Sequence, residues 1–367
     1  MTISARAAVV PRKGAPFEVR DVELDSPRAD EVLVETRAVG VCHTDIIMRE
    51  QFFPVDFPAV FGHEGAGVVT AVGEGVRHVS PGDHVVLGFA SCGWCHNCLR
   101  GLPAYCLDYY QWNFGGRRAD GSSAVRLGGG EISAHFFGQS SFANLTLCYE
   151  RNVVPIGKDV PLELFGPMGC GIQTGAGAVL NSLKVEAGSS IVVFGTGGVG
   201  LSAIMAARVA GATTIVGVDT RADRLDLARE LGATHTVDAS TSDVPARIAS
   251  ISRHGANFSV ETTGRPDVLP VAVDCLMVTG VCAAIGASPM GTTAPITMNN
   301  LIFGRSIRGV CEGDSVPHLF IPTLVELYRQ GRFPFDRMIT TYPFDDINRA
   351  CADAESGKTI KPVLTFG

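Results

Sequence analysis

The sequence predicts an α/β protein that combines a β-rich domain with a doubly wound parallel-sheet domain. Three observations predict this class. Up to about residue 160, short β-branched runs alternate with turns, and helical periodicity is poor. From Ile172 onward, strands and helices alternate in the βαβ rhythm. Glycine makes up 43 of 367 residues without a G-x-y period, which excludes collagen and indicates tight turns and close backbone approaches.

The elements follow from local patterns. In the first part, we expect strands at 31–37, 67–72 and 84–87, separated by the turns 73–75 and 81–83. In the second part, we expect strands at 191–194, 214–219, 234–237, 258–262 and 281–285. Helices are expected at 199–209, at 221–231 (where Gly232 stops the helix) and at 321–329. The predicted domains are 1–171, 172–308 and 309–367, with the parallel-sheet domain inserted between two segments of the other.

Composition excludes several classes of function. The formal net charge is −7 and no basic run occurs, which argues against nucleic-acid and anionic-membrane partners. The uncharged stretches Ala187–Ala207 and Cys275–Gly304 are interrupted by Gly, Ser, Thr or Pro, so we expect buried core rather than a membrane span. Met1–Val10 has no apolar segment typical of a secretory signal, and a cytoplasmic, reducing location is expected.

A glycine-rich loop predicts a dinucleotide site. Gly195-Thr-Gly197-Gly198-Val199-Gly200 follows an apolar strand and opens a helix, and Asp219 ends the next strand about 20 residues later. The three spaced glycines allow the turn, the approach of a pyrophosphate and close helix packing. Asp219 would bind the ribose hydroxyls and repel a 2′-phosphate, which favours NAD over NADP. Arg224 is expected to cover the adenosine side or to be a solvated helix residue.

Four clustered cysteines predict a metal site. Cys92, Cys95, Cys98 and Cys106 can close a tetrahedron of thiolates around one Zn²⁺ in a lobe at about 90–110. Such a closed site stabilises the lobe and leaves no open position for chemistry. An iron–sulfur cluster is the alternative, because thiolates alone also hold it.

A second set of metal ligands is dispersed along the chain, and spacing alone does not join it. The matching motifs are Gly40-Val-Cys-His-Thr-Asp45, Gly62-His-Glu-Gly-Ala-Gly67, Gly169-Cys-Gly-Ile-Gln-Thr-Gly175 and the terminal Ile360-Lys-Pro-Val-Leu364. With the cysteine lobe and the glycine loop, these make the chain resemble the zinc-dependent medium-chain alcohol dehydrogenases from end to end. The resemblance implies a GroES-like catalytic domain, a Rossmann NAD-binding domain and two zinc ions per chain.

The resemblance also implies the roles of individual residues. Cys42, His63 and Cys170 would be the catalytic zinc ligands. Asp45 would hold the His63 imidazole, Glu64 would lie behind the metal, and Thr44 would accept the proton of the alcohol. The cofactor contacts implied by the resemblance are His43 and Lys361 at the pyrophosphate and Thr174 beside the nicotinamide.

The implied activity is interconversion of primary alcohols and aldehydes by hydride transfer from a zinc-bound alkoxide to NAD. Ile47 stands where many members have a proton-relay histidine. Bacterial aryl-alcohol dehydrogenases and their allylic terpene-alcohol relatives share this isoleucine, as well as stretches such as Phe136–Phe142 and Glu312-Gly-Asp314. Benzyl-type or geraniol-type alcohols are therefore the expected substrates, and a homodimer or homotetramer is the expected assembly.

Two alternatives stay open at this point. One is a glutathione-dependent formaldehyde dehydrogenase or general primary alcohol dehydrogenase. Its anionic substrate would need cations such as Arg117 and Arg118, which we expect on an exposed loop. The other is a non-catalytic zinc- and NAD-binding protein of the same fold. The phenylalanines near the zinc motifs are interpreted mainly as core; they are Phe52, Phe53, Phe57, Phe61 and Phe89.

The remaining cysteines and histidines receive structural interpretations. Five thiols are expected to be core residues: Cys148, Cys275, Cys282, Cys311 and Cys351. Seven histidines are expected at the surface or in structural hydrogen bonds: His78, His84, His96, His135, His235, His254 and His318. Among these, only His135 lies in a stretch with a possible functional role.

Overall fold

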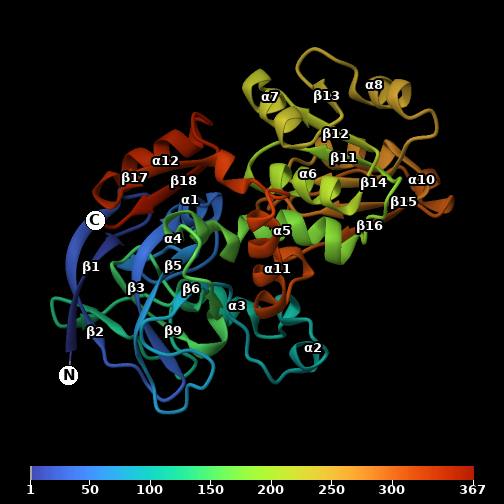
Figure 1. The fold of residues 1–367 in the computed structure, drawn as a ribbon. Coiled ribbons are helices and arrows are strands. Elements are labelled where there is room, and N and C mark those ends of the chain that lie inside the picture. The colour runs from blue at the N-terminus through green and yellow to red at the C-terminus, as the bar shows by residue number, and fades with distance from the viewer. Residues whose placement is uncertain (1) are drawn as a thin grey trace. The chain divides into compact units, whose positions relative to one another are not determined.

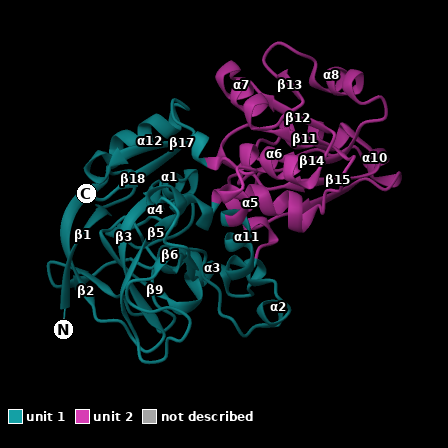
Figure 2. Cartoon of the chain, viewed as in Figure 1, with its two compact units in different colours: residues 1–170, 316–325, 336–367 teal, residues 171–315, 326–335 magenta. Residues whose placement is uncertain are grey.

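A computed structural model describes residues 2–367 as two compact units (Figure 2). Unit 1 contains the chain up to Cys170 together with residues 316–325 and 336–367. Unit 2 contains residues 171–315 and 326–335. Unit 1 is therefore built from the beginning and the end of the chain, with most of unit 2 inserted between them.

Unit 1 contains two sheets. The five-stranded sheet has the order β4-β1-β2-β7-β8. Its strands are β1 (Thr2–Val10), β2 (Glu18–Asp25), β4 (Ala59–Val60), β7 (Val125–Leu127) and β8 (Gly130–Glu131). The seven-stranded sheet has the order β10-β6-β5-β3-β18-β17, and β9 also pairs with β3. Its strands are β3 (Glu31–Gly40), β5 (Gly65–Val72), β6 (His84–Leu87), β9 (Leu145–Tyr149), β10 (Val153–Ile156), β17 (Ile339–Pro343) and β18 (Lys361–Thr365).

The core of unit 1 lies on the seven-stranded sheet. Val32 and Val34 of β3 are fully buried and pack with Val69, Val85 and Leu87 from the neighbouring strands. β3 is the sheet's central strand, and β-branched residues suit a strand that is covered on both faces. The short helices of this unit are α1 (His43–Arg49), α2 (His96–Leu99), α3 (Tyr109–Phe114), α4 (Leu162–Phe165) and α12 (Ile347–Glu355).

Unit 2 is a six-stranded parallel sheet with flanking helices (Figure 1). In the order β13-β12-β11-β14-β15-β16, the strands are β13 (His235–Asp238), β12 (Thr214–Asp219), β11 (Ser190–Phe194), β14 (Ala256–Glu261), β15 (Leu276–Ala284) and β16 (Ser306–Gly309). The helices are α5 (Gly171–Gly177), α6 (Gly198–Ala210), α7 (Ala222–Leu231), α8 (Val244–Ile251), α9 (Val268–Asp274) and α10 (Met298–Ile302). This parallel sheet and the β-rich unit 1 confirm the predicted fold class.

Two elements begin several residues before the position expected from the sequence. β15 begins at Leu276 rather than Val281. Leu276 already pairs with Ala256 of β14, and after a register shift the pairing continues from Phe258 and Val281. α11 (Pro317–Arg329) begins before residue 321, since proline is tolerated in the first turn of a helix. Within residues 2–367, no helix combines the length and apolarity needed to cross a bilayer.

Candidate active site

Three segments of unit 1 bring the dispersed ligand set together. Cys42 precedes the first turn of α1, His63 and Glu64 lie between β4 and β5, and Cys170 ends the first long segment of the unit. One potential ligand atom from each of these four residues lies within 4.8 Å of the others. His63 Nε2 lies 3.2 Å from Cys170 Sγ. The Cys170 thiol and the Lys361 cation hold the pKa of Cys42 well below its usual value. Two thiolates and one imidazole nitrogen are a donor set that suits an open zinc site.

Asp45 orients this ligand set. Its Oδ1 accepts hydrogen bonds from His63 Nδ1 at 2.9 Å and from the Gly62 backbone N–H at 3.0 Å. Its Oδ2 accepts the Cys42 backbone N–H at 2.9 Å, which also caps α1. With Nδ1 bound to a carboxylate, Nε2 is the ring nitrogen left to face the thiols. The Thr44 hydroxyl of the same turn lies 3.6 Å from Cys42 Sγ.

A buried ion pair lies beside the ligands. Lys361 Nζ from β18 donates to both carboxylate oxygens of Glu64, at 2.8 and 2.9 Å. Burial by itself would lower the pKa of Lys361, but the Glu64 carboxylate more than offsets that effect and raises it. A Cβ at Gly40 would lie 2.0 Å from Glu64 Oε2, so glycine is required there for the carboxylate to fit. Lys361 is thus bound to Glu64, and its predicted role at the pyrophosphate stays a prediction.

Gln139 and Phe137 support His63, and sequence reasoning did not single them out. The buried amide of Gln139 donates to the carbonyls of His63 at 3.0 Å and Gly88 at 3.1 Å, and it accepts the Gly65 N–H. The Phe137 ring stacks on the His63 imidazole with centroids 4.4 Å apart. Phe137 has φ of 52°, a strained value for a residue other than glycine. The only signal in the sequence was the family stretch 136–142 that contains both residues.

The four predicted lobe cysteines also converge. Cys92 Sγ lies 3.9 Å from Cys98 Sγ, and Cys95 Sγ lies 4.0 Å from Cys106 Sγ. Tetrahedral zinc with Zn–S bonds of about 2.3 Å places sulfurs about 3.8 Å apart, so the spacing fits. Backbone N–H groups, first that of Leu107, lower the pKa of the Cys95 thiol to about 6. The arrangement therefore fits a closed structural zinc site.

In unit 2, the glycine loop has the geometry of a phosphate cradle. Gly195 has φ of 85°, and a Cβ at Gly200 would lie 1.8 Å from the Gly195 carbonyl oxygen. A Cβ at Gly197, by contrast, would meet nothing within 4 Å, so the backbone there is open to a ligand. Gly198 and Val199 form the first turn of α6, whose N-terminus favours phosphate.

Asp219 and Arg224 line the same cleft, whose volume is about 700 Å³. Asp219 Oδ2 accepts the N–H and hydroxyl of Thr196, at 2.7 and 2.9 Å, and Oδ1 accepts backbone N–H groups of the next turn. These bonds fix the carboxylate at the end of β12. Arg224 Nε is buried without a hydrogen-bond partner among the described residues, as expected of a side chain that faces a ligand site.

The other two predicted cofactor residues lie on helices. His43 is exposed in the first turn of α1 in unit 1, and Thr174 is buried on α5 in unit 2. Thr174 Oγ1 donates to the carboxylate of Glu312 at 3.4 Å. The Glu312 carboxylate was missed by the sequence-based site prediction, although its tripeptide was noted.

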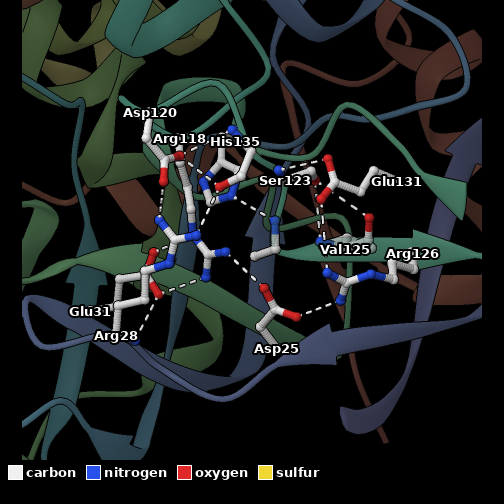
Figure 3. A network of polar contacts seen from close by, with 12 residues as sticks. Asp25, Arg28, Glu31, Arg118, Asp120, Ser123, Val125, Arg126, Glu131 and His135 are labelled. Carbon is white, nitrogen blue, oxygen red and sulfur yellow. Dashed lines mark hydrogen bonds and ion pairs between the residues drawn. The ribbon is translucent and has the colours of Figure 1, made fainter. Parts of the chain in front are cut away.

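Arg118 does not lie on an exposed loop, which corrects the expectation. Figure 3 shows its guanidinium between Glu31 and Asp25, with Arg126 and Glu131 continuing the ion pairs. The side chain is 1% exposed and makes two hydrogen bonds to Glu31, at 2.7 and 2.8 Å. A side chain in these pairs is not available to an anionic substrate.

His135 lies in the same network, and its burial gives it a structural role. Its Nε2 accepts the Ala124 N–H at 3.2 Å, and Nδ1 has no partner within the described chain. Burial, together with the cation Arg118, lowers the pKa of His135 to about 3.

Four of the five predicted core thiols are buried, whereas Cys311 is only half-buried. For Cys311 the core interpretation was wrong, because it follows the exposed edge strand β16.

The fold and the two sites define a metal-dependent, dinucleotide-binding oxidoreductase. Family models agree: an alcohol dehydrogenase GroES-like domain matches residues 28–158, and a zinc-binding dehydrogenase matches residues 198–329. The chain is 47% identical over 367 residues to geraniol dehydrogenase of Castellaniella defragrans, covering 99% of this chain and 98% of the relative.

Two solved structures extend the comparison. Benzyl alcohol dehydrogenase of Acinetobacter calcoaceticus is 48% identical, with a TM-score of 0.97 and full coverage of both chains. An alcohol dehydrogenase zinc-binding domain protein from Burkholderia ambifaria is 51% identical, with a TM-score of 0.99 and full coverage. The chain belongs to the zinc-dependent alcohol dehydrogenases of the medium-chain family, which bind NAD(P).

Proposed function

We propose that the enzyme interconverts aromatic or allylic primary alcohols, of the benzyl or geraniol type, and their aldehydes with NAD as cofactor. The observation that carries the proposal is the set of aromatic side chains around His63, a proposed metal ligand. Phe137 stacks on its imidazole, and Phe136 meets the same ring edge-on, with centroids 5.3 Å apart. Phe114 and Phe53 continue the contacts outward. Flat, conjugated substrates suit such surroundings, and both named relatives act on alcohols of this kind.

The chain's own residues position the reaction. A zinc ion held by Cys42, His63 and Cys170 would supply Lewis acidity, and NAD would supply the hydride acceptor. Asp45 fixes the imidazole orientation. Thr44 Oγ1, close to Cys42 Sγ, would take the proton of the substrate hydroxyl. Ile47, half-buried on α1, has no group that can carry the proton further, so the onward transfer would use water.

NAD is preferred over NADP in this proposal because hydrogen bonds fix Asp219 in the cleft, where it would meet the adenosine ribose. A carboxylate there accepts hydrogen bonds from the ribose hydroxyls and repels a phosphate.

We also propose a cytoplasmic location, since the metal sites need reduced thiols. A homodimer or homotetramer is proposed from the edge strand β16, whose four residues are all exposed.

The decisive experiment compares kcat/KM for benzyl alcohol, geraniol, ethanol and S-hydroxymethylglutathione, each with NAD and with NADP. The expected result is a preference for the first two alcohols and for NAD. Preference for S-hydroxymethylglutathione would instead support the formaldehyde dehydrogenase alternative, which the buried ion pairs of Arg118 disfavour. If the protein holds two zinc ions per chain but turns over none of these alcohols, the result would support a non-catalytic binding protein.

A further inference from the structure

A left-handed tripeptide follows the last parallel strand of unit 2. Glu312, Gly313 and Asp314 have φ values of 48°, 66° and 50°. Two of these residues are not glycine, and three consecutive left-handed residues persist only where the surroundings hold them. Such strain is typical of segments that place a functional group, and the group placed here is the Glu312 carboxylate, which is 8% exposed.

Unit 2 holds this segment firmly against α5. A Cβ at Gly177 would lie 2.2 Å from the Gly313 carbonyl oxygen, so the two backbones are in close contact. Asn181 Nδ2 donates to that oxygen at 3.1 Å, and Arg308 pairs with Asp314 at 2.6 Å. Ser315, the next residue, donates to Gln173 of α5 at 2.8 Å. The Glu312 side chain is therefore fixed next to Thr174, whose hydroxyl donates to it.

The same helix contacts the phosphate loop. A Cβ at Gly175 would lie 2.0 Å from the Val199 carbonyl oxygen in the first turn of α6. Thr174 and Glu312 are thus tied through α5 to the loop that would hold the pyrophosphate.

The sheet order indicates which half of a dinucleotide lies at Glu312. Asp219 ends β12, on one side of the central strand β11, and β14, β15 and β16 lie on the other side. Dinucleotides bind across the carboxyl ends of such strands, with the two nucleosides on opposite sides. If the adenosine ribose lies at Asp219, the nicotinamide lies on the β14–β16 side. Glu312 follows the carboxyl end of β16, at Gly309.

From this placement, we propose that Glu312 is a charge-recognition residue for the nicotinamide ring, a role that rests on the proposed use of NAD. The ring carries a positive charge when oxidised and is neutral when reduced. A fixed, buried carboxylate attracts the cationic form and has little effect on the neutral form. Glu312 therefore strengthens binding of NAD⁺ relative to NADH.

The test measures the dissociation constants of NAD⁺ and NADH for the zinc-loaded enzyme without alcohol, by calorimetry and by NADH fluorescence. Glu312→Gln keeps the shape and removes the charge, so Kd for NAD⁺ is expected to rise about tenfold while that for NADH changes less than about twofold. Glu312→Asp withdraws the carboxylate by one methylene and is expected to shift the ratio of the two constants less, in the same direction. Glu186→Gln, an exposed carboxylate of the same unit, is the matched control and is expected to leave the ratio unchanged.

Several outcomes would overturn the inference. If Glu312→Gln changes both constants equally, the carboxylate has only a structural role; if it changes neither, the carboxylate does not act on the cofactor. Should Glu312→Gln fail to fold, an unchanged ratio in Glu312→Asp overturns the inference just as well. If the wild-type enzyme binds neither NAD⁺ nor NADH, the proposed cofactor itself is wrong. If the wild-type enzyme binds both NAD⁺ and NADH and Glu312→Gln leaves the ratio of the two dissociation constants unchanged, the proposed function stands but this inference fails.

Discussion

At the residue scale, Asp45 has the most consequential contacts, because its two oxygens accept hydrogen bonds from three donors near the proposed metal ligands. Asp45→Asn replaces one acceptor oxygen with an NH₂ group that must face a donor. We expect zinc affinity at the catalytic site to fall about 10- to 100-fold, as for other lost partners of ligating histidines. Chelator competition measures this, with the exposed Asp56→Asn as control. Equal zinc affinity in the two variants would contradict the orienting role.

His135 predicts a dependence of stability on pH. Its pKa is about 3 in the folded enzyme, against about 6.5 in an unfolded chain. Between these values the unfolded state binds more protons, so this residue's contribution to stability is complete above pH 6.5 and is lost as the pH falls. From pH 7.5 to 5.0 the loss is expected to be about 2 kcal/mol.

Denaturant unfolding of the zinc-loaded enzyme at both pH values checks this expectation. His135→Gln can still accept the Ala124 N–H but does not titrate. Its loss of stability between the two pH values is therefore expected to be smaller than that of the wild type by about 2 kcal/mol. The exposed His96→Gln is the control and is expected to follow the wild type. An identical pH dependence in His135→Gln and wild type would show that the buried imidazole is not responsible.

At the scale of elements, Arg118 joins parts of unit 1 that are distant in sequence. Its partners lie on β2 and at the start of β3, and Glu31 is 87 residues away. Arg118→Met leaves the buried Glu31 carboxylate without its cation, so we expect a loss of about 3–5 kcal/mol in the free energy of unfolding. Arg117→Met breaks only the partly exposed pair with Glu131, and its cost is expected below about 1 kcal/mol. Thermal unfolding measures the stability of both variants, and an equal loss in Arg118→Met and Arg117→Met would contradict this expectation.

Local patterns account for what could be predicted from the sequence. The four-cysteine lobe and the glycine loop each lie within a short stretch, so spacing alone indicates their chemistry. The alternation of strands and helices likewise predicted the parallel sheet, with shifts only at element ends. The catalytic ligand set needed the family resemblance, because Cys170 meets His63 across 107 residues.

The residues that were missed depend on contacts with no local pattern. Gln139 reaches His63 across 76 residues, and Glu312 reaches Thr174 across 138. A glutamine or glutamate in a loop is usually solvated, so nothing in composition marks these side chains as buried. Arg118 was placed on an exposed loop for the same reason. The domain bounds and the roles of the cofactor residues remain predictions.

At the scale of the whole molecule, the exposed edge of the unit 2 sheet predicts an assembly. Large apolar side chains gather around β16 and α10: Val278, Met298, Leu301, Ile302, Phe303 and Ile307 are all exposed. An exposed edge strand beside such a patch is typical of a subunit interface. Ile302→Lys is expected to lower the molar mass measured by light scattering toward that of one chain. Ser250→Lys on α8, which packs at the opposite edge strand β13, is expected to leave the mass unchanged.

The return of the chain to unit 1 has a consequence for biosynthesis. All four lobe cysteines lie within residues 92–106, so that zinc site can fill while the ribosome is still translating unit 2. The catalytic site cannot be finished so early. Its Glu64 meets Lys361 only when β18, the neighbour of β3 and far later in the sequence, has left the exit tunnel. A nascent chain can therefore bind metal at the four-cysteine lobe well before β18 brings Lys361 to Glu64.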